Sequence, residues 1–238
     1  MPVEHTIELE AGEELAAVYH PCGGDRWVFF CHGFRSDKHG SYEERCEQAV
    51  AADFNAVRFD FRGSGDSDRP FVETNLTTRI ADLEAVVDHF DPPSYALFGS
   101  SFGAKTAFHA AADAPRLRAL VGRAPVTYNR VFDAYREAVE REGRLQLDAD
   151  HAISSAFFED FETYDFEAAA AQVDVPVALF HGRADATVPL ESCLDAVGAL
   201  EADVRLQTYT DEGHRFSEAA EQRLREAAFA WLDDSYGG

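Results

Sequence analysis

Short apolar runs alternate with longer amphipathic segments along most of the chain. The runs are rich in Val, Phe and Leu, and the segments between them carry apolar residues at helical spacing. This alternation predicts an α/β fold with a mostly parallel central sheet and helices on both of its faces. The predicted strands cover residues 27–32, 55–61, 95–99, 117–123, 176–181 and 204–210, and the predicted helices cover 41–53, 76–90, 102–113, 189–200 and 216–232.

Two segments depart from the alternation. At the start, "HTIELE" and "LAAVYHP" are joined by "AGEE", which predicts an antiparallel hairpin. Residues 126–170 separate two predicted strands by more than a simple crossover requires, and they are rich in aromatic and charged residues. We expect a structured insertion of short helices there. The length of 238 residues suits a single α/β domain, residues 1–238, that contains this insertion.

The charge balance narrows the possible partners. Asp and Glu number 44 against 21 Lys and Arg, a formal net charge of −23. Such a surface repels phosphate backbones, so nucleic acid is not an expected partner. The acids are dispersed and only two lysines occur, Lys38 and Lys105. We interpret this coat as an adaptation to high salt, the alternative being an ordinary acidic cytosolic protein.

Other features bound the setting of the protein. No apolar run is long enough to cross a bilayer, and the first residues are acidic where a signal peptide would be basic and then apolar. We therefore expect a cytoplasmic protein with no membrane partner. The four cysteines lack a C-x-x-C spacing and H-E-x-x-H is absent, so neither a metal nor another cofactor is expected.

The stretch "FGSSFGA", residues 98–104, joins a predicted strand to a predicted helix. Its G-x-S-x-G pattern places Ser101 at the apex of a tight turn, where the hydroxyl can act as a nucleophile. A serine nucleophile requires a base and a carboxylate that orients it. Asp185 follows one later strand and His214 follows the next, so all three lie at carboxyl ends of parallel strands.

The same edge of the sheet offers donors for an oxyanion. The amide of Phe102 directly follows the predicted nucleophile. A second donor is expected from "FFCHGF", at the end of the predicted strand 27–32, where we predict the amide of Phe34, with Arg35 as the alternative.

Other residues could fill two of these roles. Asp185 could instead cap the following helix, and Asp133 would then be the candidate acid. His32 and His181 also end predicted strands and are alternatives to His214 as the base.

Taken together, these motifs resemble those of serine hydrolases of the α/β-hydrolase superfamily. The nearest resemblance is to small carboxylesterases of the cinnamoyl-esterase and monoacylglycerol-lipase type. The segments that carry it are "HGF" at 32–34, "DFRGSGDSD" at 60–68, "GSSFG" at 99–103, "HGRADATVP" at 181–189 and "GHRF" at 213–216.

The resemblance implies roles for two further segments. Residues 60–68 would form a structural loop in which Asp60 and Arg62 organise turns and an internal ion pair. Residues 126–170 would form a short helical cap over the active site. Aromatic side chains would then line the substrate pocket, and we predict Phe34, Tyr128, Phe132 and Phe157 as substrate-binding residues.

The predicted function is hydrolysis of small carboxylic esters through an acyl-enzyme on Ser101. A thioesterase, a peptidase or an acyltransferase with the same three residues remains an alternative, because fold and triad do not determine the acyl acceptor. A non-catalytic binding protein on the same scaffold is a further alternative. The sequence is compatible with either a monomer or a homodimer.

Overall fold

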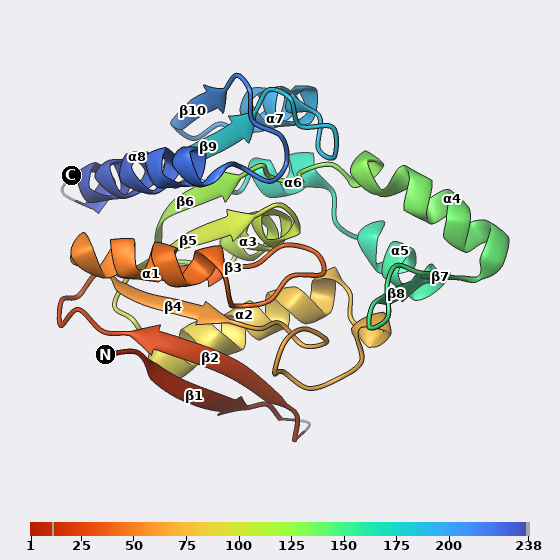
Figure 1. The fold of residues 1–238 in the computed structure, drawn as a ribbon, viewed down its shortest axis with the longest axis horizontal. Helices are drawn as coiled ribbons and strands as arrows, with labels where there is room; N and C mark the ends of the chain where they lie inside the picture. Colours follow the sequence, from red (N-terminus) through yellow and green to blue (C-terminus); the bar gives the residue numbers. More distant parts are fainter. Residues whose placement is uncertain (11, 237–238) are drawn as a thin grey trace.

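An eight-stranded sheet runs through the centre of the protein (Figure 1). The structure is a computed structural model that describes residues 1–10 and 12–236. The strand order across the sheet is β1-β2-β4-β3-β5-β6-β9-β10. The strands are β1 Val3–Glu8, β2 Glu14–His20, β3 Trp27–Cys31, β4 Asn55–Phe59, β5 Tyr95–Ser100, β6 Leu117–Arg123, β9 Val177–Gly182 and β10 Val204–Tyr209.

The pairing confirms a mostly parallel sheet with a hairpin at its start. Strand β2 runs antiparallel to both β1 and β4, whereas the remaining neighbours in the order β4-β3-β5-β6-β9-β10 pair in parallel. Residue 11, in the predicted "AGEE" turn, lies outside the described residues. Because the parallel strands point the same way, their carboxyl ends meet at one edge of the sheet.

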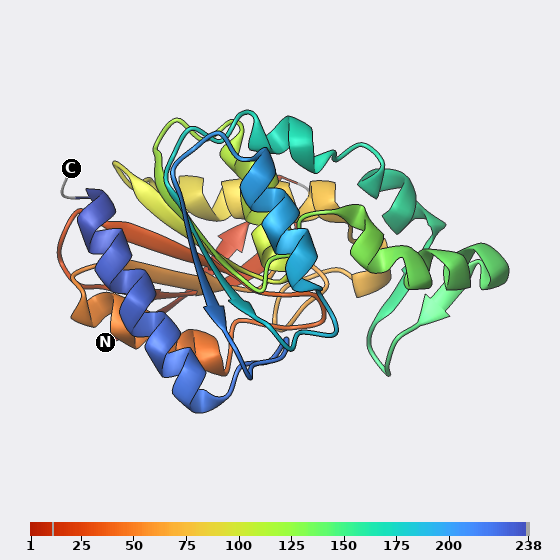
Figure 2. The ribbon, with the colours of Figure 1, turned by 90° about the horizontal axis from the view of Figure 1, so that it is seen from above.

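Helices cover both faces of the sheet. Helices α1 (Ser41–Ala51) and α8 (Glu218–Tyr236) lie on one face, and α2 (Leu76–Phe90), α3 (Phe102–Ala111) and α7 (Leu190–Ala199) lie on the other (Figures 1 and 2). All these elements lie within a few residues of their predicted bounds. No helix in the described part of the chain has the length and apolar content needed to span a membrane.

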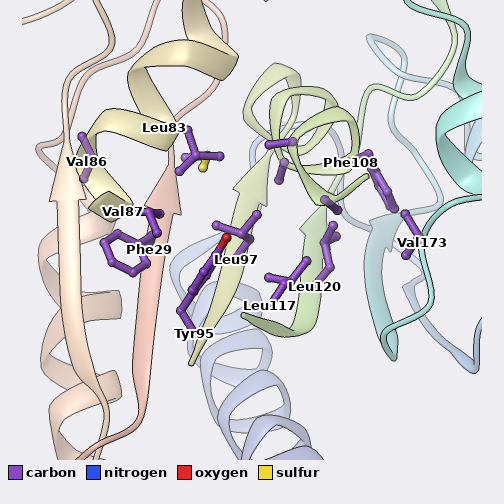
Figure 3. Close-up of a cluster of buried hydrophobic side chains, with 14 of the residues drawn as sticks. Phe29, Leu83, Val86, Val87, Tyr95, Leu97, Phe108, Leu117, Leu120 and Val173 are labelled. Atoms are coloured by element: carbon purple, nitrogen blue, oxygen red, sulfur yellow. The ribbon is translucent and has the colours of Figure 1, made fainter. Parts of the chain in front are cut away.

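The largest of the three apolar clusters in the described part of the chain lies between the sheet and α2, α3 and α7. Phe29, Leu97 and Leu120 point from neighbouring strands toward Leu83 of α2 and Phe108 of α3 (Figure 3). The central strands are buried along their whole length because helices cover both of their faces. This burial explains why the strands appear in the sequence as continuous apolar runs and not as alternating ones.

Residues 126–170 fold into short elements on the side toward which the parallel strands point (Figure 1). They include the expected short helices and also a β-hairpin, β7 and β8, which was not predicted from the sequence. Its strands are three residues each, too short to produce a recognisable alternation. The elements are the 3₁₀ helix η2 Asn129–Phe132, α4 Asp133–Glu142, β7 Arg144–Gln146, β8 Ala152–Ser154, α5 Ser155–Phe161 and α6 Phe166–Ala170; a further 3₁₀ helix, η1 Phe71–Glu73, lies outside this segment.

Candidate active site

Ser101 lies at the sharp corner between β5 and α3. Its backbone has φ 52° and ψ −117°, a conformation that is unfavourable for a residue with a side chain. Two glycines make the corner possible. A Cβ atom at Gly99 would meet the backbone of Ala104, and one at Gly103 would meet the carbonyl oxygen of Cys31. The helix can therefore pack tightly against the strand ends.

The loops after β9 and β10 bring two side chains to this corner. Nε2 of His214 lies 3.0 Å from Oγ of Ser101, and Nδ1 of His214 lies 2.8 Å from Oδ2 of Asp185. A carboxylate can only accept, so Nδ1 donates to Asp185 and Nε2 accepts from the serine hydroxyl. The two loops are joined by a hydrogen bond from the Ala184 amide to the Glu212 carbonyl, at 2.9 Å.

Asp185 is buried, at 7% exposure, and each of its oxygens has a different task. Oδ2 pairs with His214, while Oδ1 accepts from the amides of Thr187 at 2.8 Å and Val188 at 2.9 Å. Burial alone would raise the pKa of Asp185, but the hydrogen bonds from His214 and these amides outweigh it and lower that pKa. The carboxylate is thus ionised and fixed in orientation.

The alternative residues hydrogen-bond to other partners, although Nε2 of His181 also lies 3.6 Å from Oδ2 of Asp185. His32 donates from Nδ1 to the Gly33 carbonyl and accepts at Nε2 from the Phe61 amide, and burial lowers its pKa well below the usual range. His181 donates from Nε2 to the Val188 carbonyl. Asp133 is exposed at the start of α4. Neither histidine nor Asp133 hydrogen-bonds with Ser101 in the described part of the chain.

The predicted oxyanion donors flank Ser101. A Cβ atom at Gly33 would lie 3.4 Å from Cβ of Ser101, so the loop that carries Phe34 packs against the serine. The rings of Phe34 and Phe102 are 5.6 Å apart. Within residues 1–10 and 12–236, no backbone or side-chain acceptor takes the amide hydrogen of Phe34, Phe102 or Arg35.

A cavity of about 680 Å³ opens beside Ser101. Ser101, His214, Phe34 and Phe132 line it. Phe157 is buried behind them, with its ring 5.7 Å from that of Phe34. Tyr128 does not line this cavity.

Tyr128 lies at a separate surface hollow beside α7. Its ring packs on Phe166 at 5.2 Å and lies under the guanidinium of Arg130 at 4.3 Å. The chain turns away from the active site between Val126 and Phe132, and this turn separates Tyr128 from the other predicted pocket residues.

Comparison with known proteins identifies the family. The sequence profile of the prolyl oligopeptidase family matches residues 41–238. The matched residues include Ser101, Asp185 and His214. The chain belongs to the prolyl oligopeptidase family.

Relatives of this family member include hydrolases of known structure. The mitochondrial palmitoyl-protein thioesterase ABHD10 of Rattus norvegicus is 28% identical over 222 residues, which cover 85% of this chain and 73% of the relative. The structure of mouse α/β-hydrolase domain-containing protein 10 superposes with a TM-score of 0.85 at 23% identity, covering 98% of this chain and 99% of the other. Est1E from Butyrivibrio proteoclasticus, bound to ferulic acid, gives a TM-score of 0.85 at 19% identity, covering 98% and 100%. The predicted α/β-hydrolase fold is confirmed.

In this family member, residues 60–68 brace the loop that carries Phe34. The buried carboxylate of Asp60 accepts from the backbone amide and from Nζ of Lys38, both at 2.6 Å. Gly65 has φ 54°, and a Cβ atom there would collide with Asp60. Arg62 pairs with Asp82 of α2 at 2.6 Å and with Glu13 at 2.8 Å, so the ion pairs of this segment extend to other elements.

Sequence reasoning missed a buried ionic cluster in the cavity wall. Arg45 of α1, Arg123 of β6 and Glu221 of α8 line the same cavity as Ser101. Arg45 also donates from Nη1 to Oγ of Ser100, at 2.8 Å. These side chains come from distant parts of the chain and belong to no local motif. In the described part of the chain, no three His, Cys, Asp or Glu side chains form a group that could hold a metal ion.

Proposed function

We propose that the protein is a serine hydrolase that cleaves carboxylic esters through an acyl-enzyme on Ser101. The observation that carries this proposal is the hydrogen-bonded chain from Ser101 through His214 to Asp185 at a strained strand-to-helix corner. This geometry supplies a nucleophile, a base and an orienting carboxylate in one place.

Acylation follows from the positions of these groups. Oγ of Ser101 attacks the ester carbonyl while its proton passes to Nε2 of His214. The negative charge that develops on the carbonyl oxygen is stabilised by the amides of Phe34 and Phe102. The tetrahedral intermediate then collapses, the bond to the alcohol oxygen breaks, and His214 returns the proton to the departing alcohol.

In deacylation, water is the nucleophile and Oγ of Ser101 is the leaving group. Water enters the site, gives a proton to Nε2 of His214 and attacks the acyl carbonyl. The same two amides stabilise the second oxyanion, and His214 reprotonates Ser101 as the acid leaves. Asp185 stabilises the imidazolium form of His214 in both halves.

We assign substrate contacts to Phe34 and Phe132, and a cap function to residues 126–170. The position of Phe132 supports both assignments. Phe132 lines the cavity beside Ser101, and it also packs in an apolar cluster with Val139, Phe157 and other residues of this segment. Phe157 packs against both Phe34 and Phe132, at ring distances of 5.7 and 5.9 Å, and so supports the pocket from behind.

Thioester hydrolysis is the second candidate. The observation that favours it is the similarity to palmitoyl-protein thioesterase ABHD10 over 85% of the chain. The chemistry on Ser101 would be the same, with a thiol in place of the alcohol as leaving group.

The test compares initial rates on an ester and a thioester with the same acyl group, for wild type and Ser101→Ala. An aminoacyl anilide and an added alcohol acceptor test peptidase and acyltransferase activity in the same assay. The proposal expects the ester to be hydrolysed and Ser101→Ala to lose both activities. Ester hydrolysis that survives in purified Ser101→Ala would overturn it.

We further propose a cytoplasmic, salt-adapted enzyme that forms one domain and acts on small-molecule esters without nucleic-acid or membrane partners. The formal net charge of −23 supports both the salt adaptation and the exclusion of nucleic acid. Sedimentation at high KCl distinguishes the monomer from the homodimer.

A further inference from the structure

The cavity beside Ser101 carries the opposite charge to the rest of the protein. Four of its lining residues are arginines, namely Arg35, Arg45, Arg123 and Arg215, and Glu221 alone among the described lining residues carries a carboxylate. The whole chain, in contrast, has a formal net charge of −23. A cavity that concentrates scarce cations favours an anionic ligand.

Arg45 and Arg123 form a cluster with Glu221, which contains two positive groups and one negative group. Glu221 bridges two guanidinium groups, with Oε2 2.8 Å from Nη2 of Arg45 and Oε1 2.9 Å from Nε of Arg123. Arg45, Arg123 and Glu221 are 1%, 8% and 7% exposed. One carboxylate therefore neutralises only one of two buried positive charges.

Several donors of the cluster have no protein acceptor. Nε of Arg45 is buried without a hydrogen-bond partner among the described residues. Arg123 uses only Nε, and no acceptor in residues 1–10 or 12–236 takes a hydrogen bond from its two terminal nitrogens. Burial, and then repulsion from Arg45, lower the pKa of Arg123. An anion in the cavity would supply acceptors for these donors and offset the second positive charge.

We propose that the substrates hydrolysed at Ser101 carry a carboxylate, and that Arg123, supported by Arg45, binds it. This inference rests on the proposed function. The contacts within the cluster favour a carboxylate as the ligand. Glu221 already binds both guanidinium groups through its carboxylate, with one oxygen on each. Planar guanidinium groups bind carboxylates through paired hydrogen bonds, and no lysine is among the described residues that line the cavity.

The two outer arginines lie where a charged substrate would enter. Arg215 follows His214, is exposed, and forms no ion pair with any described residue. Arg35 pairs with Asp148 at 3.1 Å, and both side chains are partly exposed. These cations would increase the encounter rate of an anionic ester with the site.

The first test compares charged and neutral esters. The p-nitrophenyl monoester of hexanedioic acid carries the carboxylate in the acyl group, and its methyl-capped diester is the neutral match. A hydroxy-acid ester and its methyl-capped form place the charge in the alcohol. We expect kcat/KM to favour one charged member over its neutral match by about tenfold or more, as expected for charge-assisted hydrogen bonds. Equal or lower kcat/KM for both charged members would overturn the inference.

A variant pair assigns the preference to the cluster. Arg123→Gln is expected to reduce the charged-to-neutral ratio of kcat/KM toward one. Arg116→Gln removes the same charge at the start of β6, where Arg116 pairs with the exposed Asp88 and Asp91, and should leave the ratio as in wild type. A wild-type ratio in folded Arg123→Gln would mean that Arg123 has a structural role only.

A binding measurement does not depend on the variant folding. Hexanoate should inhibit the wild-type hydrolysis of a neutral ester with an inhibition constant about tenfold lower than that of uncharged hexanamide. Equal inhibition constants would contradict the inference. These assays separate the two claims. If none of the esters is hydrolysed, the proposed function fails; if the esters are hydrolysed without a charge preference, the carboxylate site alone fails.

Discussion

Nζ of Lys105 lies 2.8 Å from the carbonyl oxygen of Thr127, deep inside the protein. Lys105 lies on α3, one helical turn after Ser101, and Thr127 lies near the start of residues 126–170, which carry α4 and α5. Nζ also lies 5.4 Å from the ring centre of Phe161, the last residue of α5, so one buried lysine contacts two parts of this segment.

This burial predicts an unusual pH dependence of stability. Desolvation lowers the pKa of Lys105 from 10.5 to about 7. Below pH 7 the lysine is protonated in both the folded and the unfolded protein. Between pH 7 and 10.5 only the unfolded protein keeps the proton, so the contribution of Lys105 to the free energy of unfolding rises with pH, by at most about 1.4 kcal/mol per pH unit.

Urea unfolding of wild type and Lys105→Met from pH 6 to pH 9 measures this contribution. The difference in free energy of unfolding, wild type minus variant, should be constant below pH 7 and then increase. A difference that stays constant to pH 9 would show that Lys105 titrates normally.

Gly103→Ala should destabilise the fold. The added Cβ atom would meet the carbonyl groups of Cys31 and His32, which belong to the backbone and cannot move without displacing β3. We expect the free energy of unfolding to fall by about 1–3 kcal/mol. Gly198→Ala is the matched control in α7, where a Cβ atom has no neighbour within 4 Å. The control should be neutral or stabilising by about 0.5–1 kcal/mol, and equal destabilisation of both variants would contradict this account.

Asp185→Asn should lower kcat by about 10³- to 10⁴-fold while the fold is retained. The amide oxygen can still accept from Thr187 and Val188, but the amide nitrogen would replace the acceptor that faces Nδ1 of His214. The imidazole would then be held in the wrong tautomer. Ester turnover and the urea midpoint, measured together, check the prediction, and a loss of less than tenfold would remove Asp185 from its assigned role.

The acidic coat should make stability depend on salt. We expect the thermal midpoint to rise from about 0.1 M to about 2 M KCl, because screening weakens repulsion between the dispersed carboxylates. Differential scanning calorimetry across this range gives the midpoint directly. A midpoint that is flat or falls with KCl would exclude the salt adaptation.

Much of this architecture could be predicted because it depends on local pattern. Buried parallel strands appear as apolar runs, and the carboxyl ends of such strands share an edge, so the meeting of Ser101, Asp185 and His214 followed from their places after three strands. The cluster of Arg45, Arg123 and Glu221 could not be predicted in this way. Its members lie on α1, β6 and α8, and their pairing depends on how helices pack across the sheet.

The insertion shows the same limit. Phe132 and Tyr128 are four positions apart and equally aromatic, yet only Phe132 reaches the cavity beside Ser101. The direction of the chain after β6 determines this difference, and that direction cannot be predicted from the amino-acid composition of the segment.

Fluorophosphonate labelling tests the central claim most directly. Wild type and Ser101→Ala are treated in parallel at high KCl, and the adduct is located by intact mass and peptide mapping. We predict one adduct on wild type, at Ser101, and none on folded Ser101→Ala. Folded wild type that takes no label, or Ser101→Ala that is labelled equally, would contradict the assignment of Ser101 as the nucleophile, and absence of labelling would favour a binding protein on this scaffold.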